Sequence, residues 1–400
     1  MQETTPSVSK GADPKNYAES LSSLRNFIIS NVVFLGEIPS SAVTFQSDEA
    51  TNSVDFSLRA KYFGERLVEL GVDECSSDDQ GNPIGLIKGK DPSLPPILIT
   101  TELDSLYEPK EEYHYSLDEE WIYGPGIMDN VAGAAAALSL PVVMPRLGLQ
   151  LSSDLLIAGF AGTMRKKQGI TCVDYFLANM NRKPRGAIIL KGGEFGRLNY
   201  YTEAVVRANI QCTGRADSIG NRNMIVAATS IVDSILAIRL PQKPRTEIVI
   251  GRFEGGFKYG VPAPSAIVGI EVRSTSNTEI NRVMEKIATL VERMRYEQGV
   301  DVRIETAAQL GAASLGFEHP LTRAAVTMLY ALGEEPRIYP SVSELIYFLE
   351  RSIPAVTIGV ASGSDWHQNR ARVRVSSFYK GLAQVVSLIQ AIDEGACDAQ

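Results

Sequence analysis

Short runs of consecutive apolar residues recur in the first half and the last part of the chain, separated by stretches of helical spacing. The runs are 97–100, 155–158, 187–190 and 355–359. Uninterrupted runs of this kind are typical of strands that are buried on both faces of a sheet. The pattern predicts a mainly parallel sheet flanked by helices, with helices over 131–140, 320–332 and 376–392.

The middle of the chain has a different pattern, in which strand and helix periods follow the order strand, helix, strand, strand, helix, strand. The strands are expected at 205–212, 247–253, 266–273 and 302–305, and the helices at 223–238 and 279–295. This order predicts a ferredoxin-like βαββαβ domain. We therefore expect an α/β domain made of residues 15–203 and 308–400, interrupted by a smaller domain of residues 204–307.

Composition limits the classes of protein that fit. The chain has 400 residues, 44% of them hydrophobic, and a net charge of −8, which argues against a nucleic-acid-binding surface. No apolar stretch has the length and composition of a signal peptide or a membrane span. The four cysteines are scattered and form no Cys-x-x-Cys pair, so free thiols in the cytoplasm are expected.

Four polar segments follow the apolar runs. They are Thr-Glu-Leu-Asp at 101–104, Tyr-Gly-Pro-Gly-Ile-Met-Asp-Asn at 123–130, Gly-Thr-Met-Arg-Lys-Lys at 162–167 and Ile-Leu-Lys-Gly at 189–192. Their order resembles that of the aminoacylase and carboxypeptidase-type dinuclear zinc peptidases (clan MH). In that family the segments read His-Leu-Asp, Tyr-Gly-x-Gly-x-x-Asp-Asn, Gly-Thr-x-x-Glu-Glu and Ile-x-Asp/Glu-Gly. The resemblance covers about residues 15–393, and it implies that the inserted domain is a lid that forms a homodimer.

The resemblance assigns a family role to six positions, but most of them carry a different residue here. Glu102 stands for the first histidine ligand, and Asp129 for the aspartate that bridges the two zinc ions. Lysines replace three carboxylates: Lys166 stands for the general base, Lys167 for the second-zinc glutamate and Lys191 for the late acidic ligand. His367 stands for the last histidine. Asp104, which orients the first histidine in the family, is present.

Charge decides what this set can hold. Two carboxylates and three ammonium groups leave one net positive charge, whereas the family set is strongly negative and attracts two dications. A dication among three ammonium groups would be repelled by several kcal/mol per contact, since even two unit charges about 4 Å apart repel by about 4 kcal/mol at an effective dielectric near 20. We therefore expect no metal and no cofactor, and lysines paired with Asp129 and Glu102. The remaining positive charge, in a cleft between the domains, would bind a small anionic or amino-acid-like ligand.

Positions that contact substrate in the family have changed too. The lid histidine would fall at Asp217, and the family's Ser-x-x-Asp becomes Ser-x-x-Glu, ending at Glu344. Asn223 and Arg273 match lid positions. The residues expected to contact substrate are Asp104, Asn223, Arg273 and Glu344.

Each of these residues also has a structural interpretation. The lysines at 166 and 167 could lie on a solvated loop, and Asp129 could cap the following Ala-rich helix. His367 could be an ordinary packed histidine, and Arg273 a structural arginine.

Three functions remain open. The first is a metal-independent enzyme, acting on a small amino-acid-like or acyl compound, in which neighbouring lysines depress one another's pKa and supply a neutral amine. The second is a non-catalytic binding protein that acts through a partner. The third is a zinc amidohydrolase with rearranged ligands (Glu102, Asp129, His367 and Glu344).

Overall fold

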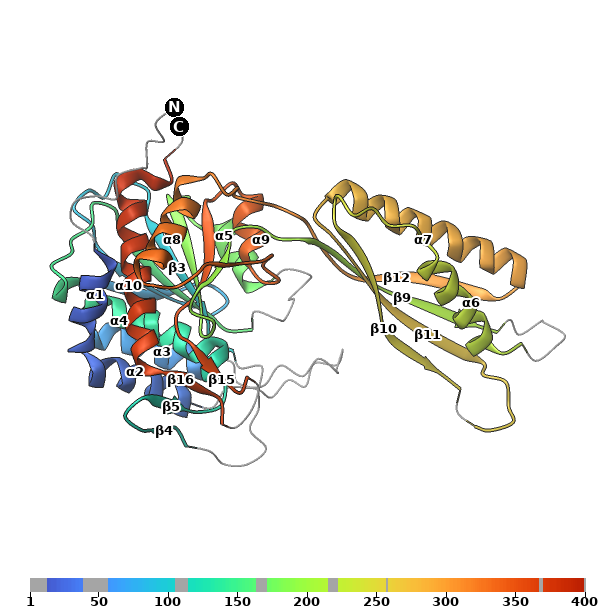
Figure 1. The fold of residues 1–400 in the computed structure, drawn as a ribbon, viewed down its shortest axis with the longest axis horizontal. Coiled ribbons are helices and arrows are strands. Elements are labelled where there is room, and N and C mark those ends of the chain that lie inside the picture. The colour runs from blue at the N-terminus through green and yellow to red at the C-terminus, as the bar shows by residue number, and fades with distance from the viewer. Residues whose placement is uncertain are drawn as a thin grey trace. The chain divides into compact units, whose positions relative to one another are not determined.

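The computed structural model describes residues 13–38, 57–104, 114–162, 171–214, 222–256, 258–366 and 370–398. The chain divides into two compact units (Figure 1). The first unit combines Met1–Tyr200 with Leu315–Gln400, and the second is Tyr201–Ser314.

The first unit is built on an eight-stranded sheet in the order β1-β2-β6-β3-β7-β14-β8-β13. The strands are β1 (Glu74–Ser77), β2 (Pro83–Ile87), β6 (Leu155–Phe160), β3 (Ile97–Glu102), β7 (Gly186–Lys191), β14 (Ala355–Gly359), β8 (Arg197–Asn199) and β13 (Arg337–Ile338). The central strands β6, β3, β7 and β14 are parallel, and they contain the four predicted apolar runs. The outer strands β1 and β2 are antiparallel to their neighbours.

Helices cover both faces of this sheet, as predicted (Figure 1). Side chains from α1 (Pro14–Ser22), α2 (Arg25–Glu37), α3 (Ser57–Glu69), α4 (Ala132–Arg146), α8 (Pro320–Ala331) and α10 (Val375–Ala391) pack on one face. On the other face lie α5 (Cys172–Asn179) and α9 (Leu345–Glu350). Successive side chains of β3 point to opposite faces of the sheet. Ile97 and Ile99 therefore pack in the core on the first face, and Leu98 packs in the core under α5 and α9.

Helix α4 is preceded by a π-helical turn, η1 (Ile127–Val131), and both run through the core. The stretch Ile127–Arg146 is long and apolar enough to cross a membrane, so the expectation that no stretch of the chain is so was wrong. However, 94% of its apolar 18-residue window is buried inside the unit, as in the core helix of a globular domain. A Cβ added at Gly133 would lie 3.0 Å from the Leu190 carbonyl oxygen, so glycine allows α4 to approach β7 closely. Asp129 lies within η1 and does not cap α4, whose N-cap is Val131. The capping prediction was wrong.

A second, small sheet in this unit is antiparallel, in the order β15-β16-β5-β4. Its strands are β15 (Gly363–Ser364), β16 (Arg372–Arg374), β5 (Trp121–Tyr123) and β4 (Ser116–Leu117). The chain ends in a second π-helical turn, η2 (Ile392–Ala396), after α10.

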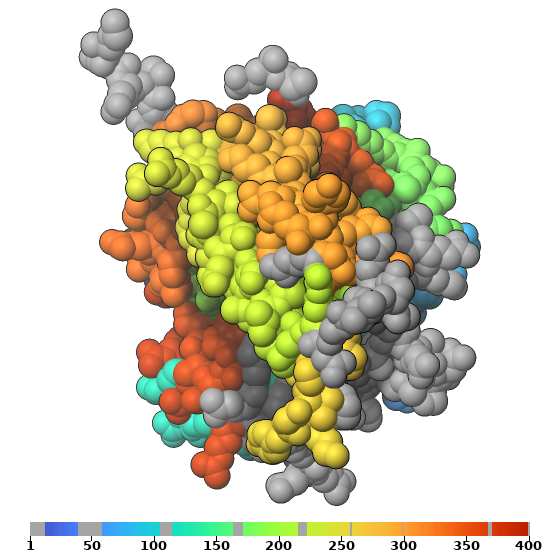
Figure 2. Space-filling model, turned by 90° about the vertical axis from the view of Figure 1, so that its right-hand side faces the viewer, coloured from blue at the N-terminus to red at the C-terminus, as the bar shows by residue number. Residues whose placement is uncertain are grey.

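The second unit has the predicted βαββαβ order. Its strands are β9 (Ala204–Thr213), β10 (Thr246–Gly255), β11 (Ser265–Ser274) and β12 (Asp301–Leu310), and its helices are α6 (Met224–Leu236) and α7 (Asn277–Gln298). The antiparallel sheet has the order β10-β11-β9-β12, and both helices pack on one face of it (Figure 1). Figure 2 shows the surface of this unit, coloured from yellow-green to orange along the sequence. Buried and partly exposed residues alternate along β9, which places Val206, Ala208 and Ile210 under the helices.

The two ends of the second unit meet. Tyr201 and Ser314 form an antiparallel bridge, and the Thr202 amide donates to the Ala313 carbonyl at 2.8 Å. One residue further out, the Leu315 amide donates to the Tyr200 carbonyl at 2.9 Å. The chain therefore leaves the first unit and returns to it at neighbouring points.

Candidate functional site

Charged side chains gather at the carboxyl ends of the central parallel strands. Glu102 is the last residue of β3, and Lys191 is the last residue of β7. In the register between β3 and β7, Thr101 is paired with Leu190. Glu102 and Lys191 are the next residues of the two strands, so both lie at the carboxyl ends of these neighbouring strands. Glu344 comes from elsewhere in the chain, directly before α9. Carboxyl ends of parallel strands are where open α/β sheets hold their ligands.

The ammonium group of Lys191 lies between the two carboxylates. Its Nζ is 2.7 Å from Oε2 of Glu102 and 3.1 Å from Oε2 of Glu344. The side chains of Lys191, Glu102 and Glu344 are only 10%, 16% and 5% exposed. We call these three residues the Lys191 cluster. The predicted pairing of the lysines with Glu102 is confirmed for Lys191. The second partner of Lys191 is Glu344, which was not among the expected partners of the lysines.

The cluster contains one cation and two carboxylates, and this imbalance shifts their pKa values. Burial alone would lower the pKa of Lys191, but the charges and hydrogen bonds of the two glutamates raise it above its usual value. Lys191 therefore stays charged at neutral pH. The predicted lowering of a lysine pKa by neighbouring lysines is wrong for this residue, because carboxylates surround it.

The two glutamates shift in opposite directions. Burial and the negative charge of Glu344 raise the pKa of Glu102 to about 7, although Lys191 opposes this. Burial also disfavours the charged form of Glu344, but the Lys191 ammonium outweighs it and lowers the pKa of Glu344. Since one ammonium cannot balance two buried carboxylates, Glu102 takes up a proton near neutral pH.

Hydrogen bonds that involve side chains as well as the backbone connect the segments around the cluster. The carboxylate of Asp104 accepts from the Gly162 amide at 2.7 Å, and Asn130 donates to the Asp104 carbonyl at 2.9 Å. The Asp129 carbonyl accepts from the Gly192 amide at 2.7 Å. These bonds fix the ends of β3, η1 and β7 relative to one another.

Arg59, on α3, is a buried charge that the sequence did not reveal. Its guanidinium donates to the carbonyls of Leu103, at 3.0 Å, and Ile38, at 2.7 Å. Burial lowers the pKa of Arg59 to about 10, and the charge of Asp104 opposes this shift. A single arginine in an amphipathic helix is expected on the solvent-exposed face, so nothing in the sequence indicated that Arg59 is buried.

The other candidates belong to the second unit or lie outside the described residues. In the second unit, Asn223 caps α6 by accepting from the Ile225 amide at 3.1 Å, and Arg273 pairs with Glu271. Both residues thus have structural roles within that unit. The candidates at 166, 167, 217 and 367 lie outside the part of the chain that the structure describes.

The described residues do not fit a zinc site. Among them, no group of three or more His, Cys, Asp or Glu side chains is arranged to hold a metal ion. Two carboxylates of the rearranged site, Glu102 and Glu344, contact an ammonium group. A dication at this place would face the charge of Lys191 at contact distance.

No family model and no curated protein matches this sequence. The structure, however, superposes on aminopeptidase PepT from Bacillus cereus with a TM-score of 0.73 and 17% identity, over 92% of this chain and 98% of that one. Human carnosine dipeptidase 1 gives 0.71 and 11% identity, over 96% and 99%. Bacillus subtilis YxeP, a dinuclear metal-binding peptidase of the M20 family, gives 0.64 and 15%, over 91% and 99%.

This chain has the M20 peptidase fold. The match extends over nearly the whole length of each chain, so both units belong to the shared M20 fold. At these identities the likeness concerns the fold alone. What the M20 fold does in this protein has to be argued from the Lys191 cluster.

Proposed function

We propose that this protein is a metal-independent enzyme on the M20 peptidase scaffold, and that it acts on a small amino-acid-like or acyl compound. The observation that carries the proposal is the Lys191 cluster, in which an ammonium group contacts two buried carboxylates at the edge of the sheet. A site that contains its own cation has no need of a bound dication to balance its carboxylates.

The cluster supplies two chemical functions. Glu102, with its pKa raised to about 7, can both accept and donate a proton at neutral pH, as a general acid–base group must. Lys191 keeps its charge and can stabilise negative charge that develops on a carbonyl oxygen. The lysines at 166 and 167 would hold an anionic group of the substrate. Catalysis would then combine proton transfer at Glu102 with electrostatic stabilisation by Lys191.

Metal content tests the first half of the proposal. After dialysis against a weak chelator, elemental analysis should find no stoichiometric zinc, and added zinc or cobalt should not produce aminoacylase or dipeptidase activity. One or two retained zinc ions per chain would overturn metal independence.

Turnover tests the second half. We would incubate the protein with a metabolite extract and follow depletion of its components by mass spectrometry. The wild type should consume an amino-acid-like or acyl compound, and Glu102→Gln should not, because glutamine cannot transfer a proton. Glu335→Gln, a change of an exposed glutamate in the same unit, is the matched control and should behave as the wild type. Equal turnover by Glu102→Gln would refute the assigned role.

A second candidate, a non-catalytic binding protein, is favoured by a separate observation. The Lys191 ammonium is paired with carboxylates of the same chain, as in a structural salt bridge. This candidate predicts that a compound from the extract is retained by the wild type and recovered unchanged. Conversion of that compound would exclude it.

We also propose a cytoplasmic homodimer formed through the second unit. All four cysteines are free thiols, as suits a reducing compartment. On α6, Val226 and Leu236 are both 61% exposed, and β10 is an edge strand. Light scattering at micromolar concentration should give the mass of two chains, and Val226→Asp should halve it. Val342→Asp, at an 86% exposed valine of the first unit, should not. A monomeric wild type would contradict the proposal.

A further inference from the structure

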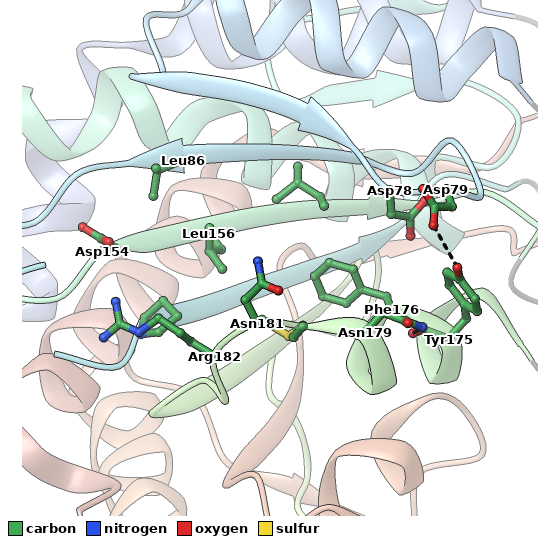
Figure 3. Close-up of a pocket in the computed structure, with 13 residues that line it drawn as sticks. Asp78, Asp79, Leu86, Asp154, Leu156, Tyr175, Phe176, Asn179, Asn181 and Arg182 are labelled. Carbon is green, nitrogen blue, oxygen red and sulfur yellow. Dashed lines mark hydrogen bonds between the residues drawn. The ribbon is translucent and has the colours of Figure 1, made fainter. Parts of the chain in front are cut away.

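A pocket lies in the first unit, between the edge of the large sheet and α5. Its volume is about 420 Å³, which is within the usual range for small organic ligands. Strands β2 and β6 form its floor, and α5 with the segment after it forms one wall (Figure 3). None of its lining residues belongs to the Lys191 cluster.

The floor is apolar because three side chains share one face of the two strands. Leu86 on β2 is paired in register with Leu156 on β6, and Ile84 lies two residues from Leu86 on the same face. All three are only partly buried, although Ile84 and Leu156 pack against the core cluster under α5. Since α5 ends at Asn179, it leaves this edge of the sheet open. The opening exposes apolar surface that a ligand could cover.

Carboxylates stand at both ends of this floor. Asp78 and Asp79 lie at one end, and Asp154 lies with Arg182 at the other (Figure 3). In the described part of the chain, no lysine or arginine forms an ion pair with any of the three aspartates. The guanidinium of Arg182 donates hydrogen bonds to the carbonyls of Pro92, Ser93 and Leu94, and it thereby holds that loop. The pocket is therefore negative overall.

The aspartates differ in how far the chain already engages them. Asp78 accepts from the backbone and side chain of Asn82 and from the Gln80 amide, so it holds a turn. Asp79 is exposed, and within the described part of the chain it accepts one hydrogen bond, from the Tyr175 hydroxyl at 3.1 Å. That bond raises the pKa of Tyr175, so the phenol keeps its proton and remains a donor to Asp79. Asp79 is the carboxylate best able to receive a cation.

An aromatic wall adjoins this carboxylate. Phe176 follows Tyr175 on α5 and lines the pocket (Figure 3). Its ring is fixed by an edge contact with Phe160, at 5.3 Å between centroids. Ring faces attract organic cations, so this wall adds to the selection for positive charge.

We propose that this pocket binds a small organic ammonium ion with an apolar body. The ammonium group lies at Asp79, and the body covers Leu86 and Leu156. The carboxylates disfavour anions, and the apolar floor disfavours fully hydrated metal ions. The site is distinct from the Lys191 cluster and takes a ligand of the opposite charge from the one expected near the lysines.

The probe is phenethylamine, compared with 2-phenylethanol and phenylacetate, which share its aromatic body but are neutral and anionic. Binding to the full chain is measured by ligand-observed NMR at millimolar probe. The amine should bind, and the alcohol and the acid should bind at least about tenfold more weakly, the difference that one charge-assisted hydrogen bond gives. Equal binding of all three, or no binding of the amine, overturns the proposal.

Two variants locate the site. Asp79→Asn removes the carboxylate from an exposed position and should weaken amine binding at least about tenfold. Met180→Trp fills the pocket from the segment after α5 and should abolish binding. Asp233→Asn, at an exposed aspartate of the second unit, is the matched control and should leave affinity unchanged. Melting temperatures establish that each variant is folded. If folded Asp79→Asn and Met180→Trp both bind as the wild type, the amine binds elsewhere and the assignment is wrong.

Discussion

The Lys191 cluster and the pocket between the large sheet and α5, which we call the Asp79 pocket, both contain more carboxylates than cations. The excess negative charge is balanced differently in the two regions. In the cluster the groups are buried, so the charges must be balanced inside the chain, by Lys191 and by the proton that Glu102 takes up. In the pocket Asp79 faces solvent, where water stabilises its charge. The burial of a carboxylate therefore decides what balances its charge. In the Lys191 cluster it is a proton together with Lys191, and in the Asp79 pocket it is an external cation.

The largest expected effect comes from removing the cation of the cluster. Lys191→Met leaves Glu102 and Glu344 facing each other in a buried site. We expect the free energy of unfolding to fall by about 3–5 kcal/mol, as when one partner of a buried ion pair is removed. Urea denaturation at pH 7 measures it.

The same experiment has an internal control. Adding Glu102→Gln and Glu344→Gln to Lys191→Met removes the uncompensated charges and should restore most of the lost stability. If Lys191→Met lowers the free energy of unfolding by less than about 1 kcal/mol, water reaches the cluster and stabilises its carboxylates, as it does for Asp79 in the pocket.

A smaller effect should appear in the pH dependence of stability. The pKa of Glu102 is raised from 4.5 to about 7 by folding, so the folded chain binds more protons than the unfolded chain between these values. The stability contributed by this group is complete below pH 4.5 and is lost as the pH rises towards 7 and above. Relative to the wild type, Glu102→Gln should therefore gain stability with rising pH, by at most about 1.4 kcal/mol per pH unit.

Urea denaturation from pH 4.5 to pH 8 checks this slope. Glu335→Gln, at an exposed position, should reproduce the wild-type profile. If Glu102→Gln shows the wild-type pH dependence too, Glu102 is ionised throughout and the proton of the cluster lies elsewhere.

The smallest effect is expected in the pocket. Asp79→Asn changes an exposed side chain that accepts a hydrogen bond from Tyr175, so the free energy of unfolding should stay within about 0.5 kcal/mol of the wild type. The contrast with Lys191→Met sharpens the comparison, because one charge supports the fold and the other does not. A loss above about 2 kcal/mol would show that Asp79 is structural.

The fold was largely predictable because its central elements have strong periodicity. The strand predicted at 355–359 matches β14, and the helix predicted at 376–392 differs from α10 by one residue at each end. Edge strands were missed. β1, β4 and β13 are short and mostly exposed, so no apolar run or alternation marks them.

The site was only partly predictable. Glu102 and Lys191 end neighbouring parallel strands, and a pairing of Glu102 with a lysine followed from the charges of the predicted site residues. The role of Glu344 did not, because it depends on how the segment before α9 packs against the sheet, and no local pattern encodes that contact. The pKa direction of Lys191 was wrong for the same reason. Counting lysines along the chain omitted the second carboxylate that holds this ammonium group.

The bridge between Tyr201 and Ser314 holds the two ends of the second unit together, so the unit is an insertion with a single junction to the rest of the chain. Because its two ends are already adjacent, replacing the whole unit by a short loop would close the gap at little entropic cost, whereas ends far apart would need a long linker. The outer hydrogen bond between Tyr200 and Leu315 would survive such a deletion. Evolution could exchange or modify this unit without disturbing the sheet that holds the charged side chains, and a protein engineer could use the same junction to graft a different binding module onto it.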